Sequence, residues 1–122
     1  MKIFLILAVL NGFLSVALGA FGAHGLEGKV SQKGLEQWGK AVDYQMFHTA
    51  ALFVTALLMD KVQTGLMTGA GWFFLAGILL FSGSLYIYAP TGIKTFAMIT
   101  PIGGLSFLIG WVLLGYAVIK HI

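Results

Sequence analysis

The segment DYQMFHTAAL, residues 43–52, carries the side chains of this sequence that could do chemistry in an apolar environment. Tyr44, Gln45 and His48 lie within about one helical turn of each other, where a long apolar run begins. An ionisable group in such a run is a candidate functional residue, because hydrocarbon offers it no hydrogen-bond partner. His48 could relay a proton or bind a ligand, or it could join helices as a neutral ring. We leave both roles open and expect these three side chains to point into the protein.

Polar side chains elsewhere in the chain could complete a polar belt around His48. His24 follows the first apolar run, near the surface at which the second run begins. The candidate partners of His48 at a suitable depth are hydroxyl and amide side chains: Ser15, Ser82 and Ser84 first, and then Asn11, Thr100 and Ser106. The predicted belt consists of His24, Tyr44, Gln45, His48, Ser82 and Ser84.

The same residues do not form a metal site, a cofactor site or a catalytic constellation. The chain has no cysteine and no arginine, which excludes disulfides, thiolate ligands, thiol nucleophiles and bidentate arginine clamps. His24 and His48 would need a carboxylate to hold a metal, and the nearby acids are expected at the water interface: Glu27, Glu36 and Asp43. Ser82 or Ser84 beside His48 would imitate a hydrolase dyad, but no Gly-x-Ser-x-Gly turn is present. We therefore expect no enzyme, no metal and no cofactor.

The composition of the chain is that of a membrane protein. Hydrophobic residues make up 59% of the 122 residues and charged residues only 9%, against about 25% charged residues in an average soluble domain. A soluble domain of this size could not bury so much apolar surface in one core. The net charge of +3 comes from lysines between the apolar runs, which is typical of membrane helix flanks and not of a nucleic-acid surface.

Four apolar runs are long enough to cross a membrane as helices. The first, Ile3 to Ala23, contains no charge and would measure about 31 Å as a helix, against a hydrocarbon core of ~30 Å. Lys2 before an apolar run is also typical of a signal peptide, but this run is long for one, so we expect a retained span. The predicted spans cover about 3–23, 43–60, 66–89 and 97–119. The expected fold class is an all-α integral membrane four-helix bundle, with residues 1–122 as a single transmembrane domain.

Residues 31–42 form a polar stretch with a helical pattern. Leu35, Trp38 and Val42 recur at a spacing that places them on one face, and charged residues occupy the others. The pattern predicts a short amphipathic interfacial helix between the first two spans, with Trp38 as its anchor. No helix breaker separates this stretch from the second span, so a single bent helix over both is the alternative.

The last two spans carry different end signals. Pro90, Thr91 and Gly92 should end the third span. In the fourth, Thr100 is a good N-cap and Pro101 suits the first helical position, so we expect the helix to begin or bend there. Four spans place both termini on one side of the membrane. Lysines flank both sides in similar numbers and leave the orientation undecided.

Small residues recur along three of the four spans and should let the helices approach closely, since close packing replaces the hydrophobic driving force in lipid. The stripe on the first span is the most regular of these. The residues expected to pack between helices are Gly12, Ser15, Gly19, Gly83, Gly103, Gly104 and Gly110.

Four motifs follow one another at fixed spacing: GAFGAHGL at 19–26, Trp38 with AVDYQMFHTAAL at 41–52, FSGSLY at 81–86 and TPIGGLSFLIGW at 100–111. With them the chain resembles, over its whole length, the small four-span membrane proteins of the YgdD/YwdK type, a family of unknown function. The resemblance implies a membrane protein, in bacteria one of the inner membrane, and it implies no established activity. The family pattern falls here on Gly19, Gly22, His24, Gly25, Tyr44, Gln45, His48, Ser82, Gly83, Ser84, Tyr86, Pro101, Gly103, Gly104 and Trp111.

Two functional hypotheses remain. The first is a non-enzymatic multi-pass protein of the bacterial cytoplasmic membrane, which acts as a scaffold or binds a partner or lipid and whose helices are joined by the His48 belt. The second is a carrier or channel for a small solute or for protons that uses His48. A chain with four helices is too small to enclose a conduit, so the carrier would have to be a homo-oligomer. Under both hypotheses we expect membrane lipid as a partner and no nucleic acid. A protein partner stays undefined.

Overall fold

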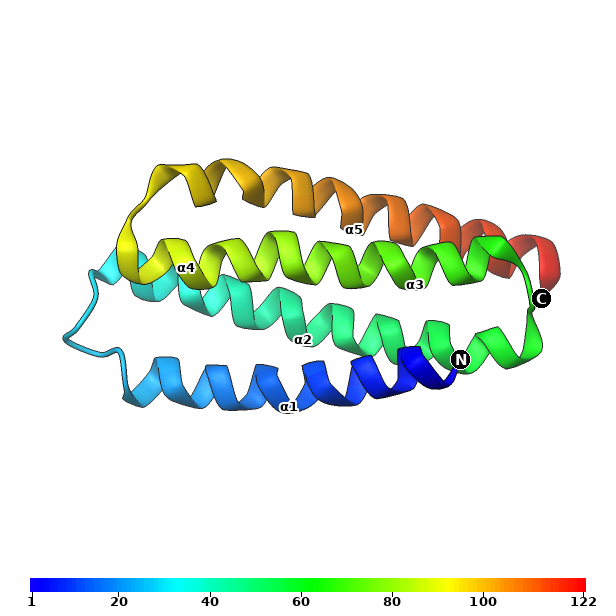
Figure 1. Cartoon of the computed structure of the whole chain (residues 1–122), viewed down its shortest axis with the longest axis horizontal. Coiled ribbons are helices and arrows are strands. Elements are labelled where there is room, and N and C mark those ends of the chain that lie inside the picture. The colour runs from blue at the N-terminus through cyan, green and yellow to red at the C-terminus, as the bar shows by residue number, and fades with distance from the viewer.

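The computed structural model describes all residues from 1 to 122, and every regular element in it is helical (Figure 1). The elements in chain order are α1 (Lys2–His24), α2 (Gln32–Lys61), α3 (Gly65–Gly77), the π-helix η1 (Ile78–Ser82), α4 (Gly83–Thr91) and α5 (Lys94–His121). The elements α3, η1 and α4 follow without a gap and form one rod. Four helical segments are thus long and apolar enough to cross a membrane. The predicted fold class, an all-α membrane bundle, is confirmed.

The four segments run up and down, and both termini lie at the same end of the bundle (Figure 1). α1 packs against α2, and the rod from α3 to α4 packs against both α2 and α5. The central rod therefore separates α2 from α5 over much of their length. α2 and α5 therefore flank the rod without close packing between them.

The polar stretch at 31–42 and the second span form one helix. Ser31 caps its first turn, where the hydroxyl accepts the backbone N–H of Gly34 at 3.0 Å. The helix then continues from Gln32 to Lys61. A separate interfacial helix is therefore wrong, and the alternative of a single helix is the arrangement found. The cause is the absence of proline from residues 32–61, since the single glycine at the junction, Gly39, is tolerated inside a helix.

The fourth span begins earlier than its sequence signals predict. α5 starts at Lys94, directly after Gly92 turns the chain with a φ of 69°. Thr100 does not cap the helix; its hydroxyl donates to the carbonyl of Phe96 one turn earlier, at 3.2 Å. Pro101 therefore lies inside α5. The prediction of a helix start at Thr100 and Pro101 is wrong, because the helix already begins directly after the tight turn at Gly92.

Small residues bring the helices into contact at two interfaces. On α1, Gly19 lies 3.3 Å, measured from an added Cβ, from a methyl group of Val42 on α2. On α5, an added Cβ at Gly110 would lie 2.8 Å from the Phe74 ring, and one at Gly103 would overlap the backbone of Phe81. The remaining small residues predicted to pack are less closely covered by neighbouring helices: Gly12, Gly83 and Gly104.

Candidate functional site

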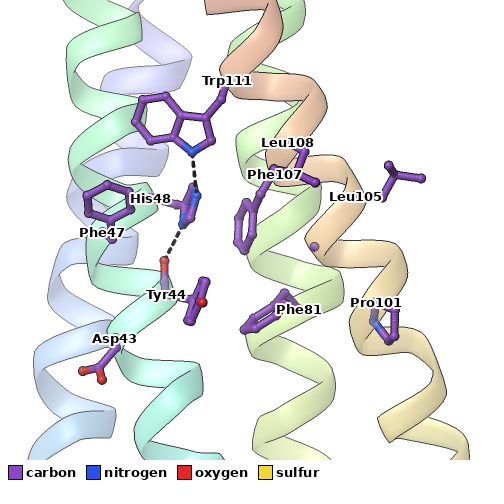
Figure 2. Close-up of a pocket in the computed structure, with 11 residues that line it drawn as sticks. Asp43, Tyr44, Phe47, His48, Phe81, Pro101, Leu105, Phe107, Leu108 and Trp111 are labelled. Carbon is purple, nitrogen blue, oxygen red and sulfur yellow. Dashed lines mark hydrogen bonds between the residues drawn. The ribbon is translucent and has the colours of Figure 1, made fainter.

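His48 lies near the middle of the bundle, with both ring nitrogens hydrogen-bonded. Its side chain is 3% exposed, and it lies about 24 Å along α2 from Gln32. Nε2 of His48 is 3.0 Å from the indole nitrogen of Trp111 on α5. Nδ1 is 2.9 Å from the backbone carbonyl oxygen of Tyr44, one turn earlier in α2. His48 thus joins two helices that pack little against each other (Figure 2).

These two partners define which nitrogen of His48 carries the hydrogen. The indole N–H of Trp111 can only donate, so Nε2 must accept. The carbonyl of Tyr44 can only accept, so Nδ1 must donate. The ring is therefore the neutral Nδ1–H tautomer. A second proton would place an N–H of His48 against the N–H of Trp111 and break the bond between α2 and α5.

Aromatic side chains surround the His48 ring. The Phe107 ring is stacked on it, with centroids 3.5 Å apart and planes 10° from parallel. Phe47 and Phe74 lie at 5.2 and 5.9 Å between centroids. Because these rings are apolar, the imidazole makes its polar contacts through the two hydrogen bonds to Trp111 and to the Tyr44 carbonyl. The neutral tautomer suits this setting, because the rings would not solvate a charge.

A second polar chain joins α1, α2 and α4 around Gln45. The hydroxyl of Tyr86 donates to Oε1 of Gln45 at 2.6 Å, and Nε2 of Gln45 donates to Oδ1 of Asn11 at 3.0 Å. Asn11 passes the chain on to the carbonyl of Leu7 at 2.9 Å. Gln45 is 4% exposed, so its side chain makes its hydrogen bonds to other residues of the protein. Three of the four spans are tied together by these bonds.

The two serines of the predicted belt bind elsewhere than at His48. Ser82 is fully buried and donates to the carbonyl of Ala41 at 2.7 Å, which joins η1 to α2. The Ser84 hydroxyl lies 2.6 Å from that of Thr100 and joins α4 to α5. Ser15 turns back to the carbonyl of Gly12 on its own helix at 3.0 Å. The prediction that these serines would be the partners of His48 is wrong.

Two other residues of the predicted belt do not point into the protein. The Tyr44 side chain is 44% exposed and packs against Phe81 at 4.5 Å between centroids, with the rings tilted by 36°. Only the backbone carbonyl of Tyr44 binds His48. His24 is exposed at the end of α1. Since Gly12 faces Thr49, His48 lies level with about residue 13 of α1, and His24 is ~16 Å away along the helix axis. His24 and His48 therefore do not meet as a ligand pair.

Sequence reasoning missed the two residues that complete these networks, Trp111 and Tyr86. Both carry one strong hydrogen-bond donor on a large ring. The sequence pointed to them only as positions of the family pattern, and not as hydrogen-bond partners. A usable signal was present: tryptophan is enriched where a membrane helix meets water, yet Trp111 lies 17 residues into α5, between Lys94 and the chain end. A tryptophan in the middle of a span needs an acceptor for its N–H, and an unprotonated imidazole nitrogen is a good one.

The gap between α2 and α5 is a lateral groove of about 760 Å³. Figure 2 shows its two walls, α2 and α5, with aromatic rings between them. The residues that line it are Asp43, Tyr44, Phe47, His48, Phe81, Pro101, Gly104, Leu105, Phe107, Leu108 and Trp111. Its outer side chains are exposed on the face that a membrane would cover, Phe47 at 61% and Leu108 at 64%. His48 forms part of its wall at the inner end.

Asp43 lines the same groove. Gly19 faces Val42, so Asp43 is level with about Leu18 of α1. The charge-free run of α1 continues for six more residues before the loop, to His24, or ~9 Å. The Asp43 side chain is exposed. That it lies at the water interface stays a prediction.

The comparisons with known proteins agree with the fold. A family model described as a protein of unknown function (DUF423) matches residues 18–104. UPF0382 membrane protein YwdK of Bacillus subtilis is 50% identical, with 100% of each chain covered. The chain belongs to this family. Two staphylococcal members, SAB0533 of Staphylococcus aureus and SERP0230 of Staphylococcus epidermidis, are each 48% identical over 98% of both chains.

The family assignment confirms the resemblance expected from the four motifs, and it identifies the chain as a membrane protein of unknown function. No solved structure matches the chain. The DUF423 match includes Asp43, Gln45 and His48 and ends at Gly104, inside the groove. The relatives' full-length coverage extends the likeness to α5 and Trp111.

Proposed function

We propose that this DUF423 protein is a non-enzymatic lipid-binding module, which holds one apolar chain of a membrane amphiphile in the groove between α2 and α5. The observation that supports this most directly is the groove itself. It is open sideways toward the surrounding lipid, and its volume of about 760 Å³ falls within the ~300–1,000 Å³ typical of ligand sites. Its aromatic and aliphatic lining suits an acyl chain better than a polar solute.

The polar networks support a structural role for the belt beside this groove. Each buried side-chain nitrogen and oxygen has a hydrogen-bond partner, and the bonds of Gln45, Ser82 and Ser84 run between different spans. Networks of this kind hold helices in one register. We infer that they keep α2 and α5 apart at the width of the groove.

The hydrogen bonds of His48 favour the lipid-binding module over a proton carrier. A relay residue must accept a proton and release it on the other side. His48 would first have to break its bond to Trp111 on α5. The carrier alternative therefore needs this bond to break and re-form in every cycle.

We propose the bacterial cytoplasmic membrane as the location of the protein. The four spans need a lipid bilayer, and the relatives from Bacillus subtilis and Staphylococcus aureus are named membrane proteins of bacteria. Spanning helices are typical of the cytoplasmic membrane. Fractionation of a bacterium that expresses the full chain would test this location.

A groove-filling variant tests the lipid-binding function. Gly104 lines the groove, and the nearest atom to an added Cβ is a ring carbon of Phe81 at 3.9 Å, so Gly104→Leu should fill the space without a backbone clash. Gly115→Leu is the matched control, because it lies on the same helix and nothing stands within 4 Å of its added Cβ. The full chain would be reconstituted in phosphatidylcholine nanodiscs, released into detergent and weighed by native mass spectrometry.

The wild-type protein and Gly115→Leu should each retain about one phospholipid, and Gly104→Leu should lose it. Equal retention by all three proteins, or no retention by the wild type, would overturn the lipid-binding function. Proton flux into liposomes, measured for the wild type and for His48→Ala, distinguishes the lipid-binding module from the carrier. A flux in the wild type that His48→Ala abolishes, with its thermal stability intact, would favour the carrier instead.

A further inference from the structure

We propose that the groove selects a single-chain amphiphile with an ammonium headgroup, and that Asp43 is the residue that binds this headgroup. The inference rests on the proposed lipid-binding function and adds the charge of the ligand. Asp43 is the only charged side chain among the groove-lining residues. It lies on α2 below Phe47 in Figure 2, on the side of the helix that is turned away from α5. A cation there would be the complementary occupant of the site.

The depth of Asp43 supports a cationic partner. Its side chain is exposed, and its position opposite Leu18 places it beside the charge-free run of α1, ~9 Å from the end of that helix. An ionised carboxylate in that position is costly without a counter-charge, so such residues are functional candidates by default. The headgroup of an amphiphile whose chain lies in the groove would reach this depth from the side.

The rings beside Asp43 are placed to bind an organic cation. Phe47 follows Asp43 by four residues and shares its face of α2, and Tyr44 is next to it. The two side chains are 61% and 44% exposed, and the Tyr44 ring also packs against Phe81 at 4.5 Å between centroids. Aromatic faces attract ammonium groups through their quadrupoles, and a quaternary ammonium is the preferred guest of such sites. The carboxylate and the rings thus favour the same ligand.

Along α5, the groove has room for a chain behind the headgroup. Its lining runs from Pro101 to Trp111, which is ~15 Å of helix. Beyond Asp43, toward α1, a second recess of about 430 Å³ has Glu27 and Asp43 as its only charged lining residues. Glu27 is thus the one further charge that lines these two recesses, and it has the same sign as Asp43, although the chain as a whole has a net charge of +3.

Lys40 is the residue that could replace the ligand as the counter-charge. It precedes Asp43 by three residues on α2, one turn closer to the loop, and it lines neither recess. A lysine in this position can extend its ammonium toward the headgroup region. A comparison of Lys40→Gln with the wild type therefore tests whether Lys40 competes with a ligand for the Asp43 carboxylate.

The test measures binding of two probes to the full chain in phosphatidylcholine nanodiscs: dodecyltrimethylammonium and dodecanol, which share a chain and differ in charge. Asp43→Asn keeps the shape of the side chain and removes its charge. Asp60→Asn is the matched control, because Asp60 is an exposed acid at the other end of α2, outside the groove. Isothermal titration would give both affinities for the wild type, Asp43→Asn, Asp60→Asn, Lys40→Gln and Gly104→Leu.

The wild type should bind the cation about tenfold more tightly than dodecanol, and Asp43→Asn should remove this preference, as expected for one charge pair at the protein surface. Asp60→Asn should keep it, and Lys40→Gln should keep or increase it. Equal binding of both probes, or an unchanged preference in Asp43→Asn, would overturn the role of Asp43 and leave the lipid-binding function standing. If neither probe binds, or Gly104→Leu binds both as the wild type does, the groove function fails as well.

Discussion

The indole N–H of Trp111 donates to Nε2 of His48 at 3.0 Å, and this bond connects α2 to α5 across the inner end of the groove. It is a bond with one direction only, because an indole nitrogen never accepts. Its geometry makes the imidazole a neutral acceptor and Trp111 the donor that the helix pair depends on. The stability of the bundle should therefore respond to the loss of this one hydrogen.

Trp111→Phe should destabilise the protein by about 1 kcal/mol, because it leaves Nε2 of His48 without a donor. Thermal unfolding in detergent micelles would measure the loss. Trp72→Phe is the control, since Trp72 is 51% exposed and packs edge-on against Phe4; it should change stability by less than about 0.5 kcal/mol. Equal effects of the two substitutions would contradict the role of the bond.

Tyr86 and Asn11 should be coupled in stability although they do not touch each other. Both bind the amide of Gln45, one at Oε1 and the other at Nε2, so the loss of either partner frees the same side chain. A double-mutant cycle with Tyr86→Phe and Asn11→Leu should give a coupling of about 0.5 kcal/mol or more. Tyr88→Phe in place of Tyr86→Phe should be additive with Asn11→Leu. Additivity in both cycles would argue against the network.

Gly103 and Gly104 should differ sharply in their tolerance of a methyl group. A Cβ at Gly103 would overlap the backbone of Phe81, which cannot move aside, whereas the nearest atom to one at Gly104 is 3.9 Å away. Gly103→Ala should cost at least about 2 kcal/mol or prevent assembly. Gly104→Ala should behave as the wild type in size-exclusion chromatography and thermal unfolding. Similar behaviour of the two neighbours would show that α5 does not lie on η1 as described.

Backbone amides across the junction of the polar stretch and the second span should be protected from hydrogen exchange. α2 is continuous from Gln32 to Lys61, so amides near Ala41 and Val42 have helical partners. They should exchange about as slowly as those near Thr55, and more slowly than those of the loop at residues 26–30. Exchange mass spectrometry in nanodiscs would measure this. Fast exchange around Val42 would instead indicate a hinge between two helices.

The membrane fold follows from features that a sequence states directly. Apolar run length sets the number of spans, and the glycines of α1 and α5 indicate where helices can approach. The partner of His48 was not predictable in the same way, because a partner depends on the rotation and shift of one helix against another. Ser82 and Ser84 had suitable chemistry, yet η1 directs Ser82 to the carbonyl of Ala41 and not to His48.

The place of Asp43 beside the other helices was also not predictable. The register of α1 on α2, fixed by contacts such as Gly19 with Val42, places Asp43 level with about Leu18. A single sequence holds little information on such a register.

The π-helix η1 lets the third span hold one residue more than a regular α-helix would in the same length. Each residue turns a helix by about 100°, so this surplus residue sets the rotational phase between the half that carries Phe74 and the half that carries Ser84 and Tyr86. Removing one residue from Ile78–Ser82 would return the rod to a uniform helix and turn one half away from its partners. The alignment of the polar network with the groove thus depends on this one surplus residue.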